Sequence, residues 1–558
     1  MDKWPLSRRS ALKAMLAFST VPWVMNVRAF AASSCDDHIV RMSATVAPDT
    51  MNPFATWSSF WPLAFTYDPL VGVDAQRHGD RKGFAKEWSV ADDNLTWTFK
   101  IWPGMKWSDG QPATARDAAF TYNYLRGSMG KPDELSIGWN NTGGLEQVAS
   151  ISALDDETLQ IVTKAPTRWP VDNFNMIVPE HIWKDISYAD ARANFRNSSP
   201  LVGTGPMIVS EFQQGQFARL MPNKYFRAGP PAAAGMVFHF FDTADPIAQS
   251  LKSGDIDYGV YLTAAQWADL SQDPAIVVGQ QRTEQRIFLA FNTASGNGAG
   301  SSKALQDPAF RDAIGYAIDQ KAMVDRAFRG HADPGIGLAM PVATEYYSDL
   351  SDIRRHFDLA EANRRLDAAG YRDINGDGVR EDKDGNRFQL ELITGSGGNS
   401  VGIPPSAVQL VVGWLGQIGI PVSVNQFDSG ALAAHTAAPA KGGGAWDLLV
   451  GSTWVSASPQ DILGVGSSNL IGSPNNTSYW KNDKFDKLLS EINVTLDPKK
   501  SRELVDQAVR LIYTEAPYIV LCYPFVLDAH RKDCFKGWGT EDALSMWSYF
   551  PLDRLGPV

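Results

Sequence analysis

Apolar and polar side chains alternate one by one over residues 95–101. A period of two predicts a strand with one buried face. The Pro103-Gly104 pair that follows predicts a turn. Two further short apolar runs, residues 236–241 and 389–393, predict strands in later parts of the chain.

Helices are predicted between these strands by start signals and by an apolar period close to four. Thr114 followed by Asp117 forms a capping-box-like pair and predicts a helix that runs to about Arg126. Asp307-Pro308 and Asp497-Pro498 are two further helix starts. Helices and strands are therefore mixed in every third of the chain, which indicates an α/β or α+β fold.

The composition fits a large folded protein. The chain has 558 residues, of which 44% are hydrophobic and 20% are charged, so disordered and fibrous architectures are excluded. At roughly 150 residues per domain, three or four compact units are expected. The formal net charge is −11. An acidic surface repels phosphate backbones, so we expect no nucleic-acid partner.

The amino end carries the pattern of an export signal. The segment Ser7-Arg8-Arg9-Ser10-Ala11-Leu12-Lys13 resembles the twin-arginine export motif and precedes a mostly apolar stretch, residues 14–27, that is too short to span a bilayer. Ala29-Phe30-Ala31 offers a cleavage site. We expect residues 1–31 to be removed and the mature, soluble protein to reach the periplasm, because no later apolar run has the length of a membrane helix.

Three cysteines follow the expected signal, and an oxidising compartment permits disulfides. Cys522 and Cys534 are close enough in sequence to pair, which would leave Cys35 over. A packed Cys522 with a free Cys534 is the alternative. A lipidated Cys35 is a further alternative, although Ala32-Ser33-Ser34 lacks the leucine expected before such a cysteine.

The sequence shows no convincing catalytic signature. It contains no Gly-x-Ser-x-Gly elbow, no His-Glu-x-x-His and no Walker A loop. The eight histidines are scattered singly, so a histidine-rich metal site is not visible. The carboxylates of a glycosidase need not be close in sequence, so a secreted hydrolase remains the alternative from a different functional class.

One segment has the spacing of a calcium loop. Oxygen side chains at its first, third, fifth and twelfth positions belong to Asp373, Asn375, Asp377 and Asp384, and Gly378 takes the sixth position. The twelfth position is aspartate rather than the usual bidentate glutamate, and a Gly-Asp-Gly turn is also common without a metal. Calcium and a metal-free turn therefore both stay open. A bound ion would stiffen a surface loop and would not imply catalysis.

A series of short segments follows one another in a characteristic order. They are Met51-Asn52-Pro53, Tyr67-Asp68-Pro69-Leu70-Val71, Ala85-Lys86-Glu87-Trp88, Lys106-Trp107-Ser108-Asp109-Gly110-Gln111-Pro112, Gly203-Thr204-Gly205-Pro206, Gly254-Asp255-Ile256-Asp257, Ala290-Phe291-Asn292-Thr293 and Ala516-Pro517-Tyr518. Together they resemble the large solute-binding proteins of bacterial ABC importers, the family that serves oligopeptides, dipeptides, nickel and some oligosaccharides.

The resemblance implies an α/β, two-lobed periplasmic-binding-protein fold with a hinge and an extra subdomain inserted in the first lobe. By this resemblance the first lobe comprises residues 32–72, 182–285 and 509–558, the insertion 73–181 and the second lobe 286–508. Hinge closure on a solute would present a surface to the permease subunits of the importer. A monomeric binding protein that needs no cofactor is expected.

In peptide-binding members of the family, an aspartate shortly after a Gly-Trp pair takes the amino terminus of the ligand. Here the strand that begins at Trp446 continues into residues 451–459, where serine or alanine replaces that aspartate. A buried ammonium group without a carboxylate partner is costly, which puts a peptide bound by its amino terminus in doubt. Asp461 is the candidate replacement.

The resemblance also places nine side chains at the expected ligand site. They are Thr45, Phe60, Trp61, Phe291, Asn292, Thr453, Trp454, Ser456 and Asp461. Aromatic planes next to hydroxyl groups suit sugar rings as well as peptides, so an oligosaccharide is the alternative to a peptide-like solute. The sparse histidines disfavour nickel.

Overall fold

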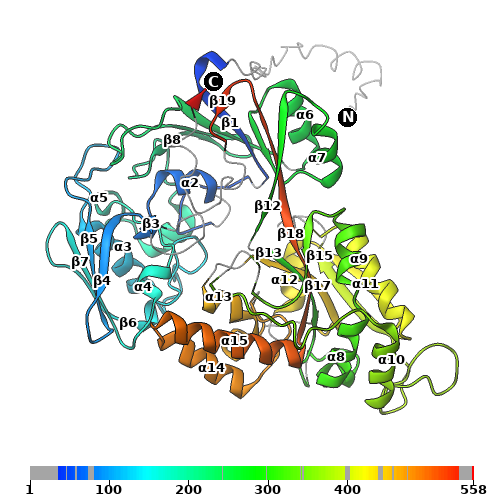
Figure 1. Ribbon diagram of the computed structural model, residues 1–558. Coiled ribbons are helices and arrows are strands. Elements are labelled where there is room, and N and C mark those ends of the chain that lie inside the picture. Colours follow the sequence, from blue (N-terminus) through cyan, green and yellow to red (C-terminus); the bar gives the residue numbers. More distant parts are fainter. Residues whose placement is uncertain are drawn as a thin grey trace, which may run out of the picture.

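The computed structural model describes residues 35–45, 47–56, 60–72, 81–241, 243–283, 285–296, 298–339, 341, 345–395, 403–437, 444–454, 458–473, 475–538 and 556–558. The expected export signal lies outside these ranges. The described chain forms two lobes joined by long strands (Figure 1). Within the described ranges, no helix is long and apolar enough to cross a membrane.

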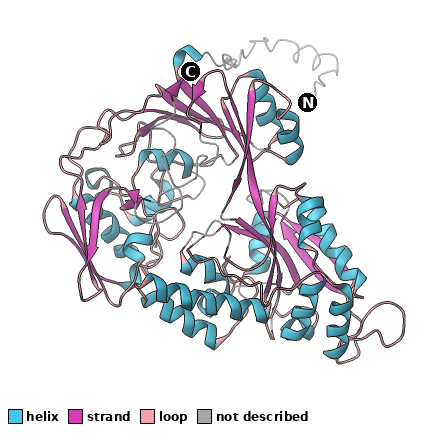
Figure 2. Ribbon diagram, viewed as in Figure 1, coloured by secondary structure: helices cyan, strands magenta, loops and turns pink. Residues whose placement is uncertain are grey.

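Strands and helices alternate through most of the chain, as the mixed pattern predicts (Figure 2). The strands are β1 (Ile39–Ala44), β2 (Val71–Gly72), β3 (Arg81–Lys82), β4 (Ala85–Val90), β5 (Thr96–Ile101), β6 (Val148–Ala153), β7 (Thr158–Thr163), β8 (Met207–Gln213), β9 (Phe217–Pro222), β10 (Gly235–Phe240), β11 (Tyr258–Val260), β12 (Ile276–Arg282), β13 (Gln285–Phe291), β14 (Ala332–Pro334), β15 (Leu390–Gly395), β16 (Val422–Phe427), β17 (Leu448–Trp454), β18 (Tyr518–Arg531), β19 (Phe535–Lys536) and β20 (Gly556–Pro557). The α-helices are α2 (Phe60–Thr66), α3 (Ala115–Ser128), α4 (Trp169–Asp172), α5 (Glu180–Trp183), α6 (Asp245–Ser253), α7 (Ala264–Leu270), α8 (Pro308–Ala317), α9 (Gln320–Ala322), α10 (Leu359–Ala368), α11 (Pro405–Gln417), α12 (Ser429–Thr436), α13 (Pro459–Leu463), α14 (Asp483–Val494) and α15 (Pro498–Glu515).

Twelve strands form a continuous network that runs through both lobes. Its order is β16-β15-β17-β13-β18-β11-β1-β10-β9-β8, and β12 and β14 also pair with β18. The first half of β18 pairs with β13 and β14, and its second half pairs with β12 and β11. In Figure 1, β18 passes from one lobe to the other. This strand and the β12–β13 connection are therefore the crossings expected of a hinge.

The first lobe is built on β1, which lies parallel to β10 and to β11. From β10 the sheet continues antiparallel through β9 to β8. Helices α6 and α7 cover the neighbouring part of the sheet, because Ile247, Leu251 and Leu270 pack against Leu527 and Ala529 of β18. The crossing strand is thus anchored in the core of this lobe.

The inserted subdomain is a four-stranded antiparallel sheet, β4-β5-β7-β6, against which α3 packs. The predicted strand is confirmed as β5, in which Trp97, Phe99 and Ile101 are buried. The predicted capping box of α3 is also confirmed: the Thr114 backbone N–H donates to the Asp117 carboxylate at 2.8 Å. Local sequence signals are sufficient to set the elements of this subdomain.

The second lobe has a core on each face of its sheet. Along β13, Ile287 and Leu289 face the core that includes α8, α10 and α11, whereas Phe288 faces the core that includes α14 and α15. Asp307 and Asp497 accept hydrogen bonds from the first turns of α8 and α15, as the two Asp-Pro signals predict. The second lobe is therefore a helix–sheet–helix sandwich.

The expected boundary at residue 509 does not fit the structure. It would divide α15, yet Leu504 and Ile512 on its two halves pack into one cluster of the second lobe. The chain returns to the first lobe only along β18, where Tyr523 still packs in the second lobe and Leu527 already packs in the first. A helix packed along its whole length cannot be divided between two cores.

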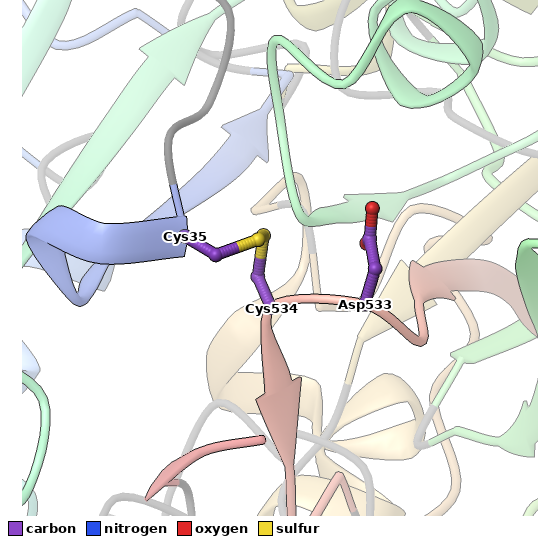
Figure 3. A group of neighbouring side chains, drawn as sticks. All are labelled: Cys35, Asp533 and Cys534. Atoms are coloured by element: carbon purple, nitrogen blue, oxygen red, sulfur yellow. A yellow bond between two sulfur atoms is a disulfide. The ribbon is translucent and has the colours of Figure 1, made fainter.

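The expected disulfide between Cys522 and Cys534 is wrong. Cys35 and Cys534 form the disulfide, and Cys522 is a free, buried thiol in the core of the second lobe (Figure 3). Arg531 is nine positions after Cys522 along an extended strand, roughly 30 Å at ~3.3 Å per residue, so Cys534 lies far beyond the reach of Cys522. The bonded sulfur of Cys35 also argues against its lipidation.

Candidate functional site

Two short helices carry predicted ligand residues, and they lie on the facing sides of the two lobes (Figure 1). In the first lobe, Trp61 belongs to α2, and it is half-buried against the core. The Gly-Thr-Gly-Pro segment sets the position of α2: the Gly205 N–H donates to the Thr66 carbonyl at 2.9 Å, and a Cβ on Gly203 would lie 2.0 Å from the same oxygen. Only glycine permits this approach.

The remaining predicted residues of the first lobe lie close to α2 in sequence or at the end of β1. Thr45 directly follows β1 and is half-buried. Phe60 is the first residue of α2. Thr45 lies where the parallel strand β1 ends, which is the usual place for ligand residues in an α/β sheet.

In the second lobe, the predicted residues gather around the end of β17. Thr453 and Trp454 are the last two residues of that strand, both half-buried, and they pair with Arg286 and Gln285 of β13. Asp461 is exposed on α13, the next described element. Ser456 lies outside the described residues.

Phe291 and Asn292 do not face a ligand site. Phe291 is fully buried in the core of the second lobe. The Asn292 amide donates to the carbonyls of Gly298 and Trp446 at 2.9 and 2.7 Å, and its Oδ1 accepts from the Ala294 N–H. These two residues of the family motif therefore have a structural role here, because Phe291 packs in the core and the Asn292 side chain is hydrogen-bonded to backbone groups.

Charged side chains of the inserted subdomain and of the second lobe are near enough to influence each other's pKa. Arg168 donates to the Asp172 carboxylate of α4 through Nε and Nη2, both at 3.2 Å. The pKa of Asp172 is raised, first by burial and then by the carboxylates of Asp461 and Glu345, against the lowering effect of Arg168. Burial and Glu345 raise the pKa of Tyr346 to about 12, and the charge of Arg168 acts on it too. We call Arg168, Asp172, Glu345 and Asp461 the interlobe charge cluster.

This cluster carries more negative than positive charge. Asp172 and Glu345 act on the guanidinium group of Arg168, which is already paired with Asp172, whereas Asp461 acts on Asp172 and on Arg286. Like charges brought together in a partly buried place repel each other, so a positively charged group between the lobes would be stabilised. The cluster can hold a cationic group of a solute.

Arg286, at the start of β13, lies behind Asp461. Its side chain is fully buried, and its Nη1 donates to the carbonyls of Leu338 at 2.6 Å and Ile462 at 3.1 Å. Burial lowers the pKa of Arg286 to about 10, and the charge of Asp461 opposes this shift. Arg286 therefore stays charged at neutral pH and holds α13 against the sheet.

The side chains of the predicted calcium loop make hydrogen bonds and ion pairs of their own in the structure. Asp373 accepts three backbone N–H groups of its own turn. Asp377 pairs with Arg387 at 3.3 Å, and Asp384 pairs with Lys303 at 3.0 Å. The side chains of Asn375 and its neighbours also bond within the loop. The four candidate ligands thus serve a turn and two surface ion pairs.

Within the described ranges, one set of three His, Cys, Asp or Glu side chains has ligand atoms close enough for a metal, namely Cys35, Asp533 and Cys534. Figure 3 shows that the two sulfur atoms are bonded to each other. Asp533 pairs with Arg531. A disulfide offers no thiolate, so this set is a structural clamp and not a metal centre.

Sequence reasoning missed Arg168, Asp172, Glu345 and Arg286. The first three come from separate segments that only the fold brings together. Arg286 did leave a signal: it is the one charged residue in the apolar run Gln285-Arg286-Ile287-Phe288-Leu289-Ala290-Phe291. A charge inside a strand that is buried on both faces calls for a specific partner.

The comparison with known families is decisive. A model of the bacterial extracellular solute-binding proteins, family 5 (its middle region), matches residues 81–468. The chain belongs to this family. Family 5 proteins are described as solute-binding proteins, which agrees with two lobes, crossing strands and charged groups between the lobes, and gives no support to the hydrolase alternative.

Family 5 relatives cover most of the chain. The oligopeptide-binding protein AppA of Bacillus subtilis (strain 168) is 24% identical over 442 residues, 78% of this chain and 76% of that protein. The nickel-binding periplasmic protein of Escherichia coli (strain K12) is 24% identical over 546 residues, 95% of this chain and 98% of that protein. A periplasmic oligopeptide-binding protein of Thermotoga maritima, solved with bound mannohexaose, has a TM-score of 0.74 and 21% identity, covering 93% of this chain and 97% of that one. The two-lobed family fold is confirmed.

Proposed function

We propose that this protein is the solute-binding subunit of an ABC importer, that it captures a short peptide between its lobes, and that it delivers the peptide to the permease. The interlobe charge cluster carries this proposal. Asp461 on α13 and Asp172 on α4 are near enough for their charges to interact, although they belong to different lobes. A free peptide brings an ammonium group, whose charge is opposite to that of the three carboxylates.

Asp461 takes the place of the family aspartate in this proposal. It is exposed, it follows the end of β17, and it sits in the first turn of α13, whose capping residue Ser458 accepts the Asp461 N–H at 3.3 Å. A charge-assisted hydrogen bond from an ammonium group to a carboxylate in a partly buried site is about twice as strong as a neutral one.

Charge from both lobes also supports a coupling of binding to closure. With Asp172 and Asp461 on opposite lobes, an ammonium group between them favours the arrangement in which the lobes are close, because it attracts both carboxylates at once. A closed form that is stable only with its solute would give the permease a signal that the protein is loaded. The relatives' names support the peptide: one of them is an oligopeptide-binding protein.

An oligosaccharide is the second candidate, favoured by two half-buried tryptophans. Trp61 on α2 and Trp454 at the end of β17 come from the two lobes, and exposed parts of indole rings stack on sugar rings. The Thermotoga maritima protein of the same fold was solved with mannohexaose. A sugar gives the acidic cluster no cation, so we rank it second.

Thermal unfolding of the mature protein with added peptides and oligosaccharides tests the proposal, since a ligand of the native state raises the melting temperature by mass action. We expect di- to tetrapeptides to raise it and their N-acetylated forms to raise it much less. Asp461→Asn should weaken peptide binding roughly 30-fold, or about 2 kcal/mol. Asp92→Asn, a change at an exposed carboxylate of the inserted subdomain, should leave binding unchanged.

Two results would contradict the peptide. A melting shift with oligosaccharides alone would replace it with the second candidate. Equal binding of free and N-acetylated peptides would show that the ammonium group is not recognised, and the interlobe charge cluster would then have a structural role only.

A further inference from the structure

A group of side chains connects the two lobes next to the crossing strands. Gln280 and Arg282 lie on β12 of the first lobe, whereas Asp333 lies on β14 of the second lobe and His331 directly precedes that strand. Arg282 donates from Nε and Nη2 to the two carboxylate oxygens of Asp333 at 2.6 and 3.2 Å, and His331 Nδ1 lies 2.8 Å from Gln280 Oε1. The ring centroid of Trp267, on α7, lies 4.9 Å from that of His331. We call Trp267, Gln280, Arg282, His331 and Asp333 the hinge clasp.

The hinge clasp reaches across β18. Phe525 of β18 pairs with Arg282 on one side, and its N–H donates to the His331 carbonyl on the other side at 3.0 Å. The Arg282 guanidinium lies 5.5 Å from the centroid of the Phe525 ring, over which it extends to Asp333. The ion pair therefore joins a strand of one lobe to a strand of the other at the point where β18 passes between them.

The hinge clasp lies on the side of the crossing strands that faces away from α2 and α13. Leu527 of β18 packs with α6 and α7, whereas its neighbour Val526 packs against the core that contains α2. Figure 1 shows α2 and α13 on one side of β18 and α7 on the other. Trp267 is held on the α7 side, because its Nε1 donates to the Gly279 carbonyl of β12 at 2.8 Å.

We propose that the hinge clasp opposes closure of the lobes and so limits how tightly this protein holds its solute. Closure brings α2 and α13 together by bending of the crossing strands, so groups on the other side of these strands move apart. The contacts of the clasp then lengthen or break, which disfavours the closed form. This inference rests on the proposed capture of a solute between the lobes, and it adds a determinant of affinity outside the predicted ligand residues.

The ion pair is the part of the clasp that substitution can remove most cleanly. The side chains of Arg282 and Asp333 are 59% and 24% exposed, so their removal leaves no cavity in a core. Partly exposed ion pairs contribute little each, although a bidentate pair is among the stronger ones. Loss of the pair should therefore change the ratio of closed to open protein by roughly 3-fold, and a repulsive pair in its place by roughly 10-fold.

Distances between spin labels on the two lobes test the clasp without any solute. Glu157→Cys in the insertion and Lys487→Cys on α14 give exposed labelling sites, while the thiol of Cys522 is buried and protected from the label. Double electron–electron resonance then measures the fraction of closed protein as the population at short distance. We expect Asp333→Arg, which opposes two positive charges across β18, to raise this fraction by roughly 10-fold, and Arg282→Met by roughly 3-fold.

An ion pair within one lobe provides the matched control. Arg219 lies 3.5 Å from Glu211 on the neighbouring strand of the first lobe and is 46% exposed, so Arg219→Met removes a similar pair that does not cross the hinge. The double change Arg282→Asp with Asp333→Arg restores a pair of reversed polarity and should return the closed fraction toward that of the wild type. An unchanged distance distribution in both single variants, a shift toward longer distances, or an equal shift in Arg219→Met would overturn the inference.

The affinity for trialanine, measured by titration calorimetry, separates the clasp from the proposed function. Asp333→Arg should tighten binding by the factor that raises its closed fraction, and mostly through slower dissociation. Weaker binding together with a larger closed fraction would overturn the link between clasp and affinity. If trialanine binds to no variant, the peptide proposal fails, and the label distances alone decide whether the clasp opposes closure. Thermal unfolding verifies that each variant is folded, and Arg282→Met serves if Asp333→Arg is not.

Discussion

Arg380 and Arg286 are both buried arginines of the second lobe, with 7% and 0% of their surface exposed, but their guanidinium groups are used differently. Arg380 donates from Nε to the Ile418 carbonyl at 2.8 Å, from Nη2 to Asn363 Oδ1 at 2.7 Å and from Nη1 to the Asp367 carboxylate. Arg286 donates from Nη1 alone, and only to carbonyl groups.

The two arginines differ in how far their guanidinium groups are hydrogen-bonded: Arg380 is fully bonded and links two helices, whereas Arg286 is only partly bonded. Arg380 ties α10, which contains Asn363 and Asp367, to the end of α11 at Ile418, and every nitrogen of its guanidinium has a partner. Burying it therefore returns several hydrogen bonds to the folded state. Burying Arg286 forms only two hydrogen bonds, so these bonds do not compensate for the desolvation of its charge.

The largest effect on stability is expected from the substitution of Arg380. Arg380→Met should lower the free energy of unfolding by about 4 kcal/mol, because the substitution leaves buried carbonyl groups without donors and removes a charge pair. Arg286→Met should lower it by only about 1 kcal/mol, because the loss of the donor to the Leu338 and Ile462 carbonyls is partly offset by the removal of a poorly compensated buried charge. Urea unfolding followed by circular dichroism measures both. An equal, large loss in the two variants would remove the distinction between them.

Asp528 is a buried acidic side chain that can be compared with the buried basic side chain of Arg286. It lies on β18 in the first lobe, 3% exposed, and accepts hydrogen bonds from the Tyr258 hydroxyl at 3.1 Å and the Gln281 amide at 2.7 Å. Burial raises the pKa of Asp528 to about 6, although both hydrogen bonds lower it. Like Arg286, this side chain is a buried charge with neutral partners only.

The raised pKa predicts how stability depends on pH. The folded protein holds the Asp528 proton more tightly than the unfolded chain, whose aspartates titrate near 3.8. The group therefore favours folding fully below that value, and this contribution is lost as the pH rises through about 6. At ~1.4 kcal/mol per pKa unit, the change amounts to about 3 kcal/mol.

Asp528→Asn checks this contribution. Its amide oxygen can still accept from Tyr258, and it does not titrate, so the variant should be more stable than the wild type near neutral pH and should lose most of the difference near pH 4. Thermal melting across that range, with the exposed Asp92→Asn as a control, gives the answer. A constant offset between the variant and the wild type at all pH values would mean that Asp528 does not titrate in this window.

The sequence predicted what local signals control. The period of two over residues 95–101 and the Thr114–Asp117 capping box lie within one strand and one helical turn, and both are confirmed. The pairing of Cys35 with Cys534 joins residues 499 positions apart, so closeness in sequence pointed to the wrong partner.

The candidate site was predicted unevenly for the same reason. Asp461 was found because the family resemblance points to that stretch of chain. Arg168 and Glu345 could not be found, because their meeting depends on how the insertion sits against the second lobe. Asn292 shows the opposite error: a segment that is characteristic of the family was taken as a ligand contact, although its amide holds the backbone.

Asp373 extends the comparison to a fully engaged carboxylate, where the smallest effect is expected. Its two oxygens accept the N–H groups of Gly376, Asp377 and Gly378 at 2.7, 3.2 and 2.9 Å, as Arg380 uses all its nitrogens. Asp373→Ala should cost about 1 kcal/mol, since the loop is exposed and water replaces the lost partner. Millimolar calcium or a chelator should leave the melting temperature of the wild type unchanged, because these oxygens are already occupied. A clear calcium shift that is absent in Asp373→Ala would show that the loop gives up its own hydrogen bonds for an ion, and a fully bonded polar group would then no longer mark a purely structural site.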